Sequence, residues 1–102
     1  MTAPPPNWPA LVEEFRTRPF GRHSADLQAL LNRFRADPIP GKHFLYMVEP
    51  HRRWVLARFT DTAPLSWELD PSQVFDTIEA AEWHVFRLRW ARRYGFDPAG
   101  EG

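Results

Sequence analysis

Apolar residues recur at helical spacing in the first third of this chain. A short helix is predicted after Asn7, which can cap it, and Arg18-Pro19 ends it. Ser24 is a good N-cap for a second helix that the Asp37-Pro38 pair terminates. The apolar positions of this second helix follow an i, i+3, i+4, i+7 pattern: Leu27, Leu30, Leu31 and Phe34. Both segments are therefore predicted to be amphipathic helices.

The middle of the chain has the composition of β-strands. Residues 43–49 alternate between two apolar sets, and residues 54–60 are rich in aromatic and β-branched side chains, with a turn at 50–53 between them. We expect an antiparallel hairpin here. Leu65 to Leu69 predicts a short third strand before Asp70-Pro71, and Val74-Phe75 predicts a last extended pair.

The last helix, from Thr77 to Tyr94, has two apolar stripes where a small domain needs one. The first stripe consists of Ile78, Ala81, Val85 and Leu88. The second stripe consists of Trp83, Phe86, Trp90 and Tyr94. We expect the first to cover the chain's own sheet and the second to be exposed in the lone chain or covered by a partner. The alternative is that the N-terminal helices fold back over the second stripe.

The order of these elements predicts an α+β fold. It comprises two N-terminal helices, a small antiparallel meander of two to four strands, and a C-terminal packing helix. We expect a proline-rich flexible tail at residues 1–8, a single domain at 9–95, and a disordered tail at 96–102.

Composition narrows the class of protein. The 102 residues include 13 basic and 13 acidic side chains, so no net charge recruits nucleic acid or an anionic membrane. There is no cysteine, hence no disulfide and no thiol nucleophile, and no apolar run approaches the length that crosses a bilayer. We expect a cytoplasmic protein that binds neither nucleic acid nor membrane. Aromatic residues make up 15%, which favours a protein interface.

Catalytic patterns are weak. The four histidines have no metal-ligand spacing, and no serine stands in a nucleophile-elbow motif. Six acidic residues, from Asp61 to Glu82, occur between Phe59 and Phe86 without a Lys or Arg. Solvated loops and helix N-terminal charges explain them, whereas acid–base work would need a cleft that shifts their pKa values. We therefore predict no catalytic residue and no metal ligand on this chain.

Several strings, in the same order, resemble those of the small (alpha) subunit of bacterial N,N-dimethylformamidase. The resemblance spans Pro19 to Arg93, and its strings include Pro19-Phe20-Gly21, His23-Ser24, Asn32-Arg33-Phe34-Arg35, Gly41-Lys42-His43-Phe44-Leu45-Tyr46, Arg53-Trp54 and Val85-Phe86-Arg87-Leu88-Arg89. The resemblance implies that a large partner subunit carries a mononuclear iron site, held by tyrosine and glutamate, and hydrolyses small N-substituted formamides. It implies no cofactor on this chain.

The resemblance further implies a hetero-oligomer in which the hairpin and the last helix face the large catalytic amidohydrolase subunit. The predicted partner-interface residues are Trp83, Phe86, Trp90, Tyr94, Trp54 and Arg53. The alternative function is a stand-alone protein-interaction or regulatory module of the same fold, with no enzymatic partner.

Overall fold

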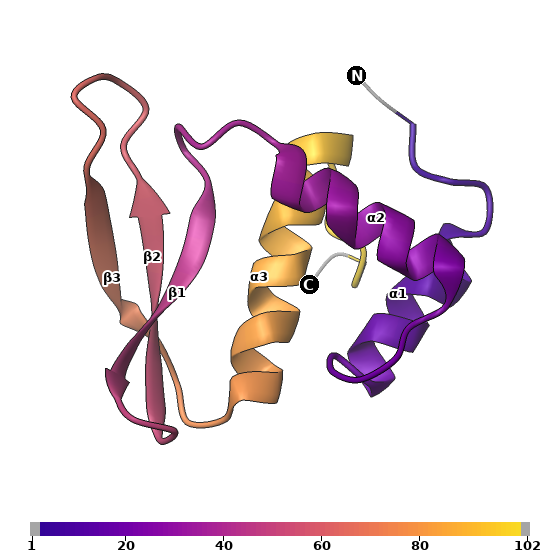
Figure 1. The fold of residues 1–102 in the computed structure, drawn as a ribbon, viewed down its shortest axis with the longest axis horizontal. Coiled ribbons are helices and arrows are strands. Elements are labelled where there is room, and N and C mark those ends of the chain that lie inside the picture. Colours follow the sequence, from indigo (N-terminus) through magenta and orange to yellow (C-terminus); the bar gives the residue numbers. More distant parts are fainter. Residues whose placement is uncertain (1–2, 101–102) are drawn as a thin grey trace. The chain divides into compact units, whose positions relative to one another are not determined.

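The computed structural model describes residues 3–100 and contains three helices and one three-stranded sheet (Figure 1). In chain order the elements are α1 (Trp8–Thr17), α2 (Ala25–Ala36), β1 (His43–Glu49), β2 (Arg53–Phe59), β3 (Trp67–Phe75) and α3 (Ile78–Tyr94). The predicted α+β class is confirmed, with two N-terminal helices, an antiparallel sheet and a C-terminal helix. Within residues 3–100, no helix is long and apolar enough to cross a membrane.

The chain divides into two compact units. The helical unit holds the described residues up to Ala36 and those from Phe86 onward, and the sheet unit holds Asp37–Val85. Helix α3 begins in the sheet unit and ends in the helical unit. The single domain at 9–95 stays a prediction, and the predicted terminal tails lie partly outside the described residues, at 1–2 and 101–102.

The helical unit buries one face of each of its helices. In α1, Leu11, Val12 and Phe15 are buried, and Pro9 occupies the first turn, where its missing N–H costs no helical hydrogen bond. In α2 the buried side chains are Leu27, Leu30 and Phe34, three of the four apolar positions that predict this helix. The apolar periodicity thus identifies the core side of both helices.

Ser24 caps α2 and joins it to α1. Its Oγ accepts the Leu27 N–H at 3.2 Å, as the N-cap prediction requires. Its own N–H and hydroxyl donate to the two carboxylate oxygens of Glu14, each at 2.7 Å. The Ser24 hydroxyl and backbone bonds lower the pKa of Glu14, because they favour its ionised form.

Residues after α3 also pack in the helical unit. The Phe96 ring lies 5.4 Å from Trp8 and 5.9 Å from Trp90, between ring centroids. Arg87 Nε donates to Asp97 Oδ1 at 3.1 Å, and this bond raises the pKa of Arg87. Phe96 and Asp97 therefore contribute contacts to the helical unit.

The sheet unit is an antiparallel meander in which β2 lies between β1 and β3 (Figure 1). The predicted short third strand and separate extended pair form one strand, β3, whose register with β2 shifts between Val55 and Leu56. The Asp70-Pro71 pair therefore lies at an irregularity within β3 and does not end the strand. Proline is tolerated there because β3 is an edge strand.

Register assigns the side chains of this sheet to two faces, since directly opposed residues in antiparallel strands share a face. We call one of them the aromatic sheet face; it comprises Phe44, Tyr46, Val55, Ala57, Phe59, Trp67, Leu69 and Val74. The opposite face includes Trp54, Leu56 and Phe75. The Phe75 ring lies 5.1 Å from that of His84, so the first half of α3 lies on this opposite side.

Candidate functional site

The second apolar stripe of α3 is largely covered by the chain itself. Phe86, Trp90 and Tyr94 keep only 2%, 0% and 2% of their surface exposed. The Phe86 ring stacks on Phe15 of α1, with centroids 4.2 Å apart and planes 13° apart. Trp90 lies 5.5 Å from Trp8. The expectation that this stripe is exposed in the lone chain is therefore wrong for these three residues.

Phe86, Trp90 and Tyr94 are buried because the two N-terminal helices are themselves rich in aromatic side chains. Phe34 of α2 meets three rings of α3 at centroid distances between 5.6 and 6.5 Å. Each α3 ring thus has partners in the helical unit, and burying large aromatic side chains dominates the stability of a small core. The alternative that the N-terminal helices fold back over the stripe describes these residues correctly.

The other predicted interface residues lie in the sheet unit. Trp83 is partly exposed, and Arg53 is exposed and pairs with Glu49 at 3.1 Å. Trp54 is buried, with 8% of its surface exposed. The stripe predicted to face the sheet contains Ala81 and Val85, and both are buried. For Trp83, Trp54 and Arg53, contact with a partner stays a prediction.

The residues of the aromatic sheet face were not among the predicted interface residues, although the hairpin to which some of them belong was expected to face a partner. Tyr46 is 41% exposed and Trp67 45%, and their rings stack at 5.3 Å. Phe44 lies 6.0 Å from Trp67 and 4.7 Å from Phe59. The alternation of Phe44, Tyr46 and Val48 along residues 43–49 places these side chains on one face of the strand. Alternation alone does not show which face of the sheet is exposed to solvent.

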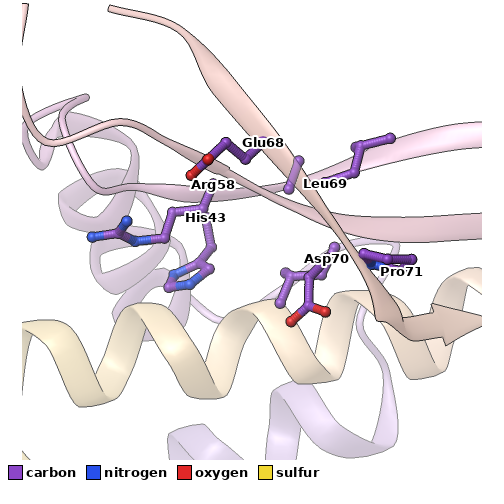
Figure 2. Close-up of a pocket in the computed structure, with 8 residues that line it drawn as sticks. His43, Arg58, Glu68, Leu69, Asp70 and Pro71 are labelled. Carbon is purple, nitrogen blue, oxygen red and sulfur yellow. The ribbon is translucent and has the colours of Figure 1, made fainter.

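A hollow of about 300 Å³ lies against the strands of the sheet unit (Figure 2). Its lining residues are His43, Leu56, Ala57, Arg58, Glu68, Leu69, Asp70 and Pro71. Figure 2 shows the His43 ring and the Asp70 carboxylate directed to the same side of the strands. Arg58 donates to both carboxylate oxygens of Asp61, at 2.8 and 2.9 Å, so its charge is already paired.

Asp70, one of the carboxylates that line this hollow, is held in its ionised form by two hydrogen bonds from Ser72. The Ser72 hydroxyl and N–H donate to Asp70 Oδ1 at 2.6 and 3.1 Å and lower the pKa of Asp70. An aspartate held in its ionised form is unsuited to donate a proton near neutral pH. Among residues 3–100, no group of three or more His, Cys, Asp or Glu side chains is placed to hold a metal ion.

These features define a small α+β protein with an aromatic core in one unit and an exposed aromatic surface in the other. Residues 7–97 match the family model of the N,N-dimethylformamidase alpha subunit, so the chain belongs to that family. This confirms the resemblance that the ordered strings indicate. The family name implies assembly with other subunits. A search of curated proteins finds no match.

Proposed function

We propose that this chain is a non-catalytic small subunit of an N,N-dimethylformamidase-like amidohydrolase. It docks on a large subunit, stabilises that subunit and leaves the hydrolysis of small N-substituted amides to it. The observation that carries the proposal is the family match, which spans residues 7–97 of this chain. We place the assembly in the cytoplasm.

The proposal assigns iron to the large subunit, as the resemblance to N,N-dimethylformamidase implies. His43, Glu68 and Asp70 line the same hollow, but among residues 3–100 no group of three such side chains is placed to hold a metal ion. One carboxylate oxygen of Asp70 also accepts hydrogen bonds from the hydroxyl and the N–H of Ser72. No catalytic step is therefore assigned to residues of this chain.

Contacts from the predicted interface residues are part of the proposal where those residues are accessible. Arg53 and Trp83 offer exposed or partly exposed surface to a large subunit. Phe86, Trp90 and Tyr94 are buried in the helical unit and would affect docking through the stability of that unit. Trp54 is similarly buried within the chain.

Co-expression with the large subunit of an N,N-dimethylformamidase-like enzyme tests the proposal. We expect a complex of the two chains that contains iron and converts N,N-dimethylformamide and water to formate and dimethylamine. The large subunit purified alone should lose activity faster on heating than the complex. A large subunit that neither binds this chain nor gains stability from it would refute the proposal and favour a stand-alone interaction module.

A further inference from the structure

We propose that the aromatic sheet face is the main surface through which this chain binds the large subunit. This inference rests on the proposed function, and it names the docking surface and what the partner must present. The partner offers an apolar surface with a recess for the stacked rings of Tyr46 and Trp67. The surface lies on the side of the sheet opposite the Phe75–His84 contact.

The geometry of the sheet holds these rings in place before any partner binds. Tyr46 belongs to β1 and Trp67 to β3, so the two rings meet across the middle strand β2. At the centre of that strand stands Ala57, whose methyl group leaves room for larger neighbours from both sides. An aromatic pair fixed by packing loses little side-chain entropy on binding, which favours an anchor role.

The exposed apolar area suits one protein interface. Exposed fractions are 41% for Tyr46, 45% for Trp67, 40% for Leu69 and 44% for Val74. The full accessible area of a large side chain is about 150–250 Å². Multiplied by these exposed fractions, the four side chains together expose on the order of 350 Å². A standard interface takes about 800 Å² from each partner, a little over half of it apolar. The face thus supplies most of the apolar area that such an interface needs.

The partner is a different chain rather than a second copy. The chain belongs to the family of N,N-dimethylformamidase alpha subunits, and the name alpha subunit implies that the enzyme has other kinds of subunit. Pairing of copies through β3 is disfavoured, because this edge strand carries Pro71 and the acidic Glu68 and Asp70.

Oxidative footprinting of the wild-type complex tests the surface without a mutation. Hydroxyl radicals modify exposed indole and phenol rings, and the modified residues are found by mass spectrometry. We expect the oxidation rate of Trp67 and Tyr46 to fall at least five-fold when the large subunit is bound. A stable complex in which both rings react at the rate of the free chain would overturn this inference and leave the proposed function intact.

Substitutions in the full-length chain give a second measurement. Trp67→Ala should weaken binding to the large subunit about 30-fold or more if Trp67 is an anchor. Glu68→Ala, an exposed neighbour on the opposite face of β3, should change the Kd less than three-fold and is the matched control. Equal effects of the two variants would refute the assignment. Protection of the rings in a homodimer of this chain alone would refute the choice of partner, and absence of any complex would refute both proposals.

Discussion

Truncation of Trp90 separates a core role from an interface role for the α3 stripe. The indole is fully buried, and five aromatic rings lie within 6.5 Å of it, between centroids: Trp8, Phe34, Phe86, Tyr94 and Phe96. In Trp90→Ala these rings lose their common neighbour. We therefore expect the free energy of unfolding to fall, whether or not the large subunit is present.

The magnitude follows from area and from one polar atom. Burial of an indole of roughly 250 Å² gives an upper estimate of about 6 kcal/mol, and core Trp→Ala changes cost about 3–5 kcal/mol. The Trp90 Nε1 is buried and has no hydrogen-bond partner among residues 3–100, so its removal also relieves a penalty of about 1–3 kcal/mol. We expect a net loss of about 3 kcal/mol, a large part of the 5–15 kcal/mol typical of a domain.

Urea unfolding of the purified chain, followed by far-UV circular dichroism, measures this loss. Trp67→Ala is the matched control: its side chain is 45% exposed, so truncation removes only about half as much buried area, and we expect about half the loss of Trp90→Ala. If Trp90→Ala leaves too little folded protein, Trp90→Phe gives the same ordering with a smaller change. A Trp90→Ala chain as stable as wild type, but unable to bind the large subunit, would contradict the core role.

Three smaller perturbations test local features of the two units. Because the Ser24 bonds lower the pKa of Glu14, they stabilise the fold above the ordinary pKa of a glutamate, and this contribution disappears as pH falls through the lowered value; in acid titrations, Glu14→Gln should lose less stability than wild type. Gly41→Ala should cost about 1–2 kcal/mol, because φ is +77° and the new Cβ would lie 2.8 Å from a carboxylate oxygen of Asp61. At Gly21, φ is +94°, and apart from its chain neighbours no atom of residues 3–100 lies within 4 Å of the position of a new Cβ, so Gly21→Ala should cost less by thermal melting; a reversed order would contradict this reasoning. Tyr94→Phe should unfold at the same or a higher urea concentration than wild type, because the buried Tyr94 hydroxyl has no hydrogen-bond partner in the described part of the chain; a loss of stability above about 1 kcal/mol would contradict this.

Local features of this chain could be predicted from its sequence. The Ser24 cap and the apolar positions of α2 involve residues three or four apart, a separation at which one helical turn determines contact. The hairpin was predicted to within one residue at β2, because the turn between 49 and 53 separates two aromatic runs. Such features depend on short stretches of chain and therefore leave patterns in the sequence.

Features that join distant segments could not be predicted. Helical periodicity shows that Phe86, Trp90 and Tyr94 share a side of α3, but it contains no information about what covers that side. The cover comes from Trp8 and Phe15, more than seventy residues earlier in the chain. Likewise both faces of β1 are apolar, so its alternation does not identify the open face of the sheet.

The placement of the aromatic residues changes what their abundance means for a partner. A high aromatic content favours an interface only for rings that the chain does not bury itself. In the helical unit Phe86 and Trp90 pack against other rings of the same unit, so the aromatic residues of this unit contribute to the stability of the fold. In the sheet unit Tyr46 and Trp67 contact each other and remain over 40% exposed, so the aromatic residues of this unit are available to bind a partner. Stability and affinity for the large subunit should consequently respond to different sets of substitutions, the first to Trp90 and the second to Trp67.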